Sequence, residues 1–131
     1  MATLTIRDEE LNGKTLNEFS LDFLTEKITV RELIRSRVYQ EVQDYNLKQN
    51  QTDFRGLVQP TDAERTLNGY RLKKPRQIDW QAQFDKALEA FQKNQILILV
   101  NDRQMESLEE EIEVGPQSSV SFLRLTLLVG G

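Results

Sequence analysis

The sequence predicts an α+β fold in which a mixed sheet packs against a main helix. Three observations predict it: alternating apolar residues near the start, an apolar repeat of three- and four-residue spacing after residue 29, and strand-like runs near the end. The 131 residues are 38% hydrophobic and 29% charged, which is the size and composition of one folded domain. We therefore predict a single domain over residues 1–131.

The first 23 residues predict a β-hairpin. Leu4 and Ile6 alternate with polar residues, and Asn12-Gly13 is a hairpin turn signal. The second strand has an apolar face and a polar face, formed by Phe19, Leu21 and Phe23 and by Glu18, Ser20 and Asp22. A polar outer face is typical of an antiparallel sheet with one side in water.

A helix is predicted over residues 30–46. Thr29 and Glu32 have the spacing of a capping box, in which a hydroxyl and a carboxylate satisfy the first backbone N–H groups. One face is apolar and comprises Val30, Leu33, Ile34, Val38, Val42 and Tyr45. We expect Arg31, Arg35 and Glu41 to lie outside this face.

Residues 47–94 are predicted to be an insertion that contains a second helix. Residues 47–78 show turn-like clusters without a sustained period, and a loop of that length is either partly structured or functional. The second helix is predicted over residues 80–93, with Asp79 as its N-cap and Asn94 as its stop. Its apolar stripe is formed by Trp80, Phe84, Ala87, Leu88 and Phe91.

The remaining residues predict the strands that complete the sheet. Residues 96–100 are a continuous apolar strand, Asn101-Asp102 is a turn, and residues 104–106 are a brief edge strand. The last strand is predicted over residues 120–128, with Val120, Phe122, Leu125 and Leu127 as buried contributors. In the element order that results, which is that of a β-grasp fold, the last strand runs parallel beside the first at the centre of the sheet.

Composition excludes several kinds of function. The chain has no cysteine and no histidine, so it lacks a thiol nucleophile, the commonest general base and the ligands that zinc prefers. We expect no catalytic residue, no metal site and no cofactor. The net charge of −4 argues against nucleic acid as the main partner. No apolar run is long enough to cross a membrane and residues 1–4 do not form a signal peptide, so we expect a cytoplasmic protein.

The sequence after the last predicted strand ends in Gly130-Gly131. Glycine has no side chain, so a narrow enzyme channel can admit it. Leu127, Leu128 and Val129 precede the two glycines and can be held by a partner as an added extended strand. The sequence therefore predicts that other enzymes act on the Gly131 carboxylate.

Four segments resemble ubiquitin-like proteins. Leu4-Thr5-Ile6 through Thr15 resembles the first hairpin of ubiquitin, and residues 28–34 resemble the helix start that ubiquitin shares with the molybdopterin and thiazole sulfur carriers. Residues 96–105 resemble ubiquitin's third strand and the turn after it, and residues 113–131 resemble the closing segment of either family. The middle, residues 47–94, has no counterpart in ubiquitin. The extended form looks most like the ubiquitin-like proteins encoded in bacterial conjugation operons.

The resemblance implies a protein modifier rather than an enzyme. An activating enzyme would use ATP to adenylate Gly131, a conjugating enzyme would transfer it to target proteins, and a metalloprotease would remove it. Ubiquitin's partners bind an apolar patch on the sheet, for which the candidates here are Leu99, Leu123 and Leu125, although for each of the three packing in the core is the favoured interpretation. Two alternatives stay open: a sulfur carrier that forms a C-terminal thiocarboxylate, and a non-covalent adaptor with an inert tail.

Overall fold

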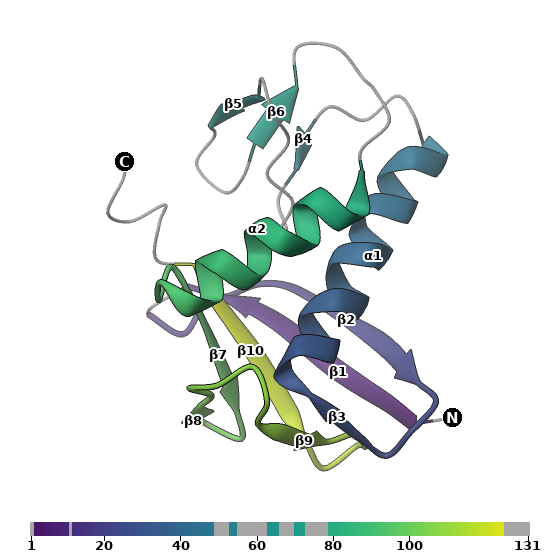
Figure 1. Cartoon of the computed structure of the whole chain (residues 1–131). Helices are drawn as coiled ribbons and strands as arrows, with labels where there is room; N and C mark the ends of the chain where they lie inside the picture. The colour runs from purple at the N-terminus through teal and green to yellow at the C-terminus, as the bar shows by residue number, and fades with distance from the viewer. Residues whose placement is uncertain are drawn as a thin grey trace.

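Five strands form one mixed sheet in the order β2-β1-β10-β7-β8 (Figure 1). Their bounds are Ala2–Glu9 for β1, Thr15–Phe23 for β2, Ile96–Val100 for β7, Arg103–Gln104 for β8 and Ser119–Arg124 for β10. The central pair, β1 and β10, is parallel, with Ile6 opposite Val120, and the other pairs are antiparallel. This computed structural model describes residues 2–10, 12–48, 53–54, 63–65, 70–72 and 79–124.

Two tight turns set the hairpins at the two sides of the sheet. In the first hairpin, the N–H of Glu10 donates to the Lys14 carbonyl over 2.9 Å, and Gly13 takes a φ of 89° that suits glycine. In the second, Asn101 and Asp102 have φ values of 52° and 66°, so the two-residue turn between β7 and β8 is of the type that matches strand twist. Both turns lie where the sequence predicts them.

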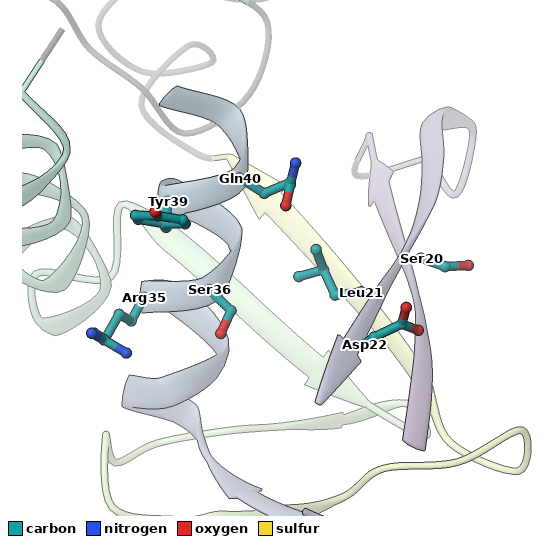
Figure 2. Close-up of a pocket in the computed structure, with 7 residues that line it drawn as sticks. All are labelled: Ser20, Leu21, Asp22, Arg35, Ser36, Tyr39 and Gln40. Atoms are coloured by element: carbon teal, nitrogen blue, oxygen red, sulfur yellow. The ribbon is translucent and has the colours of Figure 1, made fainter. Parts of the chain in front are cut away.

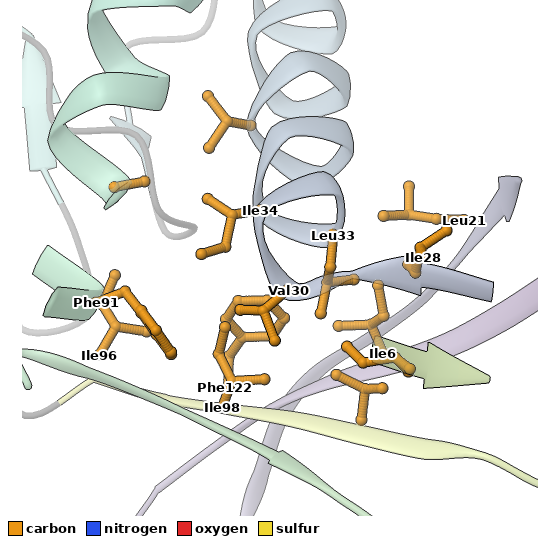
Figure 3. Packing of buried hydrophobic residues seen from close by; sticks show 14 of the residues in the cluster. Ile6, Leu21, Ile28, Val30, Leu33, Ile34, Phe91, Ile96, Ile98 and Phe122 are labelled. Atoms are coloured by element: carbon orange, nitrogen blue, oxygen red, sulfur yellow. The ribbon is translucent and has the colours of Figure 1, made fainter. Parts of the chain in front are cut away.

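The helix α1, Val30–Lys48, lies across one face of the sheet, as Figure 1 shows. The Thr29 hydroxyl accepts from the N–H of Glu32 over 3.2 Å, which is the N-terminal cap that the sequence predicts. The six apolar residues predicted for this helix are all buried. They pack against the inward side chains of the strands, including Ile6, Ile98 and Phe122 (Figure 3).

A short pair of strands below α1 was not predicted. The strands β3, Lys27–Thr29, and β9, Glu111–Glu113, pair antiparallel with Ile28 opposite Ile112. Both isoleucines are buried in the core cluster. The loop after β8 is thereby attached to the start of α1, which explains why Ile112 is apolar in an otherwise acidic segment.

The second helix, α2, spans Trp80–Gln92 and packs against α1 (Figure 1). Asp79 caps its first turn by accepting from the N–H of Gln81 over 3.1 Å. At its end Asn94 has a φ of 59°, and the N–H of Gln95 donates to the Ala90 carbonyl over 2.8 Å. This is a Schellman motif, so the predicted stop at Asn94 is confirmed together with its physical cause.

The segment between the helices contains three short strands. They are β4, Asp53–Phe54, β5, Ala63–Arg65, and β6, Tyr70–Leu72, and they form a separate sheet in the order β4-β6-β5. The sequence predicts that residues 47–78 are either partly structured or functional. The three strands show that this segment is partly structured. The rest of the segment lies outside the described residues.

The predicted α+β class, with a mixed sheet, a main helix and an extra helix, is confirmed. Two strand limits differ from the prediction. The brief edge strand is Arg103–Gln104 instead of residues 104–106, because Met105 turns inward and is buried. The last strand is described from Ser119 to Arg124, and its predicted extension over residues 125–128 lies outside the described residues.

Candidate functional site

The sheet has a second face, which points away from α1. On β7 the side chains of Ile96 and Ile98 enter the core, so the pleat directs Leu97 and Leu99 to the opposite face. On β10 the same alternation separates Phe122, in the core, from Leu123. We call Leu97, Leu99 and Leu123 the outer-face leucines.

Strand pairing brings the outer-face leucines together. Leu97 lies directly opposite Leu123 in the register of β7 and β10, and Leu99 lies opposite Ser121 on the same face. Directly opposite side chains in an antiparallel pair are neighbours, with Cβ atoms about 5 Å apart. Three leucines therefore form one apolar area across the two strands, next to the strand end from which residues 125–131 continue.

The outer-face leucines differ from one another in burial. Leu97 and Leu99 are partly buried, and Leu123 has an exposed fraction of 9%. The core cluster includes Leu4 and the other inward residues, but none of the outer-face leucines. Leu99 thus lies outside the core cluster and is partly buried, whereas Leu123 lies outside the cluster but is itself buried. Leu97 was not predicted as a site residue, although alternation from Leu99 within the same strand would have identified it.

Charged residues lie beside the outer-face leucines. Arg7 on β1 forms an ion pair with Glu18 on β2, with 3.3 Å between Nε and the carboxylate oxygen. In the register, Arg7 is opposite Ser121 and Glu9 is opposite Leu123. An apolar centre with a charged and polar rim is the usual anatomy of a protein interface.

A buried arginine supports the same strands from the opposite side. Arg37 on α1 has an exposed fraction of 1%. Its two terminal nitrogens donate to the Asp8 carboxylate on β1, over 2.5 and 2.7 Å, and its Nε donates to Glu41 over 3.0 Å. The guanidinium carbon lies 5.0 Å from the ring centroid of Phe19 and 4.5 Å from that of Phe122. Arg37 thus connects α1 with β2, β1 and β10 near the point where β10 ends.

The charge of Arg37 is stabilised by its two carboxylate partners. Burial acts to lower the pKa of Arg37, but the charges of Glu41 and Asp8 and their hydrogen bonds outweigh burial, so the pKa is raised. The guanidinium remains protonated, and each of its three nitrogens donates a hydrogen bond to a carboxylate. A buried charge with this set of partners is a structural support rather than a reactive group.

Neither a metal-binding cluster nor a membrane-spanning helix is present among the described residues. The chain has no histidine and no cysteine, and among the described residues no three carboxylates lie close enough to hold a metal ion. No helix in the described part of the chain is both long enough and apolar enough to span a membrane.

The remaining predicted site residues cannot be placed in this geometry. Leu125, Leu127, Leu128, Val129, Gly130 and Gly131 lie outside the described residues. The structure describes the strand that leads to them, which ends at Arg124. The seven residues 125–131 have a maximum reach of about 25 Å when fully extended.

Comparison with known proteins adds nothing to this geometry. No protein-family model, no curated protein and no solved structure matches the chain. Any functional assignment therefore depends on the residues and on the arrangement described above.

Proposed function

We propose that this chain is a ubiquitin-like protein modifier with a β-grasp fold, whose Gly131 carboxylate is activated and joined to target proteins. The observation that carries the proposal is the position of β10, which lies parallel to β1 at the centre of the sheet and leads into the segment that contains Gly130-Gly131. A tail that follows a central strand is anchored by the whole fold, so an enzyme can hold the domain while it acts on the glycines.

The arrangement of the elements supports the fold part of the proposal. The chain runs through a hairpin, a helix across one sheet face and returning strands, and the strand order is β2-β1-β10-β7-β8. The helix α2 and the small sheet of β4, β5 and β6 are additions to the β-grasp plan. They lie between α1 and β7 in the sequence, where an insertion leaves the order of the sheet unchanged.

The proposed chemistry begins at Gly131, because a free carboxylate does not acylate amines at neutral pH. A carboxylate oxygen of Gly131 attacks the α-phosphorus of ATP in an activating enzyme, and pyrophosphate leaves. An enzyme cysteine then attacks the acyl carbon of the adenylate and AMP leaves, which gives a thioester. A target lysine amine attacks the thioester, forms an isopeptide bond and releases the thiol. We place these steps in the cytoplasm, with a metalloprotease as the enzyme that reverses them.

The outer-face leucines are the proposed contact surface for the activating and conjugating enzymes. They lie on β7 and β10, so an enzyme that binds them is next to the start of the tail. The Arg7–Glu18 pair lies on the same face and can fix the orientation of the partner. Leu127, Leu128 and Val129 would extend this contact along the tail into the enzyme channel.

Mass spectrometry tests the proposal most directly. The chain is purified from cells that also carry its neighbouring genes, and the bound proteins are digested with trypsin. Cleavage after Arg124 leaves Leu-Thr-Leu-Leu-Val-Gly-Gly on each modified lysine, which identifies the targets. A matched sample lacks Gly130 and Gly131, and we expect it to show no such branch. Conjugates that persist in the matched sample would rule the modifier out.

The same experiment separates the two alternatives. A sulfur carrier would give an unconjugated chain in which one oxygen of the Gly131 carboxylate is replaced by sulfur. A non-covalent adaptor would give neither product while the activating enzyme is active, and its function would survive removal of both glycines. Neighbouring genes for molybdopterin or thiazole synthesis would favour the carrier, whereas conjugating enzymes would favour the modifier.

A further inference from the structure

The turn between β1 and β2 pairs an asparagine with a glycine, and both residues are exposed. Gly13 follows Asn12 and has a φ of 89°. Apart from its chain neighbours, no atom lies within 4 Å of the position that a Cβ would take at Gly13. The backbone nitrogen of Gly13 is therefore free of the side-chain crowding that any other residue would bring to this position.

The side-chain amide of Asn12 is polarised by a backbone group of the same turn. Its Oδ1 accepts a hydrogen bond from the N–H of Lys14 over 2.9 Å. A backbone N–H at a carbonyl oxygen stabilises the negative charge that develops on the oxygen when a nucleophile attacks the carbonyl carbon. The bond from Lys14 therefore activates Cγ of Asn12 toward a nucleophile.

The nucleophile closest to this carbon along the chain is the backbone nitrogen of Gly13. Its N–H donates to the Glu10 carbonyl over 2.9 Å, which holds the turn closed. This bond has to open and the N–H has to lose its proton before the nitrogen can attack Cγ of Asn12. Opening of one exposed turn costs far less free energy than unfolding of the sheet. The reactive arrangement is therefore accessible from the folded state.

Two other asparagines in described turns provide a comparison. Asn101 also accepts a backbone hydrogen bond at Oδ1, from the N–H of Ser119 over 2.9 Å. The residue after it is Asp102, whose Cβ restricts the backbone next to the nitrogen that would attack. Asn94-Gln95 has the same restriction. Asn12 differs from both because it combines an activated carbonyl with an unhindered nucleophile.

We propose that Asn12 is a site of non-enzymatic deamidation in the folded protein. The nitrogen of Gly13 forms a bond with Cγ of Asn12, the bond between Cγ and Nδ2 breaks, and the proton of the Gly13 N–H leaves with Nδ2 as ammonia. The product is a cyclic succinimide. Water opens this ring at Cγ to give aspartate, or at the backbone carbonyl carbon to give isoaspartate. These steps require only water, so the site does not depend on the proposed modifier function.

The two products change the turn in different ways. Both replace the neutral amide of Asn12 with a carboxylate, which makes the net charge of the chain more negative by one unit. Isoaspartate also adds one carbon to the backbone path between β1 and β2, so the bond from the Glu10 N–H to the Lys14 carbonyl cannot keep its geometry. Figure 2 shows Leu21 directed from β2 toward α1, and this side chain is buried. The strand therefore stays attached to the core, and the change is confined to the turn end of the hairpin.

Peptide mapping of the purified full chain tests the proposal. The chain is kept in native buffer at mildly alkaline pH, and samples are digested with trypsin, which releases Asn12 in residues 8–14 and Asn101 in residues 94–103. The other Asn-Gly pair, Asn68-Gly69, lies outside the described residues and is released in a separate peptide. We expect the deamidated fraction of residues 8–14 to grow at least about tenfold faster than that of residues 94–103, the factor that corresponds to the steric cost of a Cβ. Equal rates, or no change in residues 8–14, would overturn the proposal.

A destabilised variant shows whether the reaction takes place in the folded chain. Ile98→Ala removes core packing on β7 and increases the unfolded fraction, but leaves the β1–β2 turn unchanged. Because local opening does not require global unfolding, we expect the rate at Asn12 to be the same in Ile98→Ala and in the unchanged chain. A rate that rises with the unfolded fraction would place the reaction in the unfolded chain and overturn the proposal.

Two glycine variants test the role of Gly13. Gly13→Ala adds a Cβ beside the attacking nitrogen, and Gly115→Ala makes the same change at a glycine that has equal space around it. Thermal unfolding shows whether each variant retains the fold. In folded Gly13→Ala we expect deamidation of Asn12 to be at least about tenfold slower, and in Gly115→Ala to be unchanged. An undiminished rate in Gly13→Ala would contradict attack by this nitrogen.

Comparison with Asn12→Asp separates the two products. This variant has the charge of the deamidated chain, an oxygen acceptor for the Lys14 N–H and a normal backbone. Hydrogen exchange measured by NMR on the aged chain should show a faster exchange of the Glu10 N–H in molecules with isoaspartate, and no such change in Asn12→Asp. Equal exchange in the isoaspartate form and in Asn12→Asp would contradict the expected change of the turn.

Discussion

The guanidinium of Arg37 on α1 lies over the ring of Phe122 on β10, with 4.5 Å between the guanidinium carbon and the ring centroid. The same guanidinium forms a two-pronged hydrogen bond with Asp8 on β1. In the sheet register Asp8 lies opposite Phe122, so one buried side chain binds two adjacent residues of the central parallel pair. The helix and the centre of the sheet are thus joined by a charge as well as by apolar packing.

Among the charged residues that the structure describes, Arg37 should be the one whose replacement destabilises the fold most. We expect Arg37→Ala to lower the free energy of unfolding by about 3 kcal/mol, because Asp8 and Glu41 then lose their buried partner. Arg35→Ala, on the exposed side of the same helix, should cost less than about 1 kcal/mol. Urea unfolding of the two variants measures the difference, and equal losses would show that the buried network does not stabilise the fold.

Neighbouring residues on β7 should respond differently to truncation. Ile98 is fully buried in the core, so Ile98→Ala should cost about 2–5 kcal/mol of unfolding free energy. Leu99 lies on the outer face and is only partly buried, and we expect Leu99→Ala to cost less than about 1.5 kcal/mol. The comparison uses urea unfolding of each variant. A larger loss for Leu99→Ala would mean that the outer face is covered.

Asn94 terminates α2 with a left-handed backbone conformation, which predicts opposite effects of two small substitutions. Asn94→Ala should lower the unfolding free energy by about 1 kcal/mol, because a Cβ without a hydrogen-bonding group is disfavoured at a φ of 59°. Asn94→Gly should leave stability unchanged or raise it slightly, since glycine is preferred at this position. Thermal unfolding of both variants ranks them, and a more stable alanine variant would be inconsistent with the Schellman motif.

Glu110 predicts a loss of stability in acid. Its carboxylate accepts from the backbone N–H groups of Glu106 and Ser107, over 2.7 and 3.4 Å, and from Arg103 over 3.4 Å. The bond from Glu106 is the main cause that lowers the pKa of Glu110, and together with the bonds from Ser107 and Arg103 it outweighs the opposing effect of burial. A lowered pKa stabilises the fold above the unfolded-state pKa of about 4.3, and this contribution disappears as the pH falls through the folded-state pKa.

Comparison with Glu110→Gln isolates that contribution. We expect the unchanged chain to be more stable than Glu110→Gln at pH 6, and the difference to shrink as the pH is lowered below about 4. Urea unfolding at a series of pH values provides the measurement. A difference that is constant over this range would show that the carboxylate charge of Glu110 does not contribute.

The sequence predicted the elements whose signals are local. The hairpin turn at Asn12-Gly13, the cap at Thr29 and the stop at Asn94 each depend on a few adjacent residues, and each is present. The continuous apolar run at residues 96–100 gave the correct bounds of β7. The short pair of β3 and β9 was missed because three-residue strands carry little pattern and Ile28 and Ile112 are distant in sequence.

The site was only partly predictable for a related reason. Leu99 and Leu123 were selected as candidates, but which face each occupies depends on the register of β7 against β10. Arg37 was overlooked because a charged residue in a helix is ordinarily solvated, and its burial depends on Asp8, 29 residues away in sequence. Long-range pairing of this kind leaves no periodic signal within either segment.

The parallel pairing of β1 with β10 also determines when the domain can be completed during synthesis. Residues near position 5 pair with residues near position 120, so the ribosome must produce almost the whole chain before the central strand is available. A product that stops before residue 119 has the hairpin of β1 and β2 without the strand that joins it to β7. Truncated chains therefore lack the middle of the sheet rather than its edge. Only a chain that extends through β10 can complete the sheet, and residues 125–131 follow that strand in the sequence.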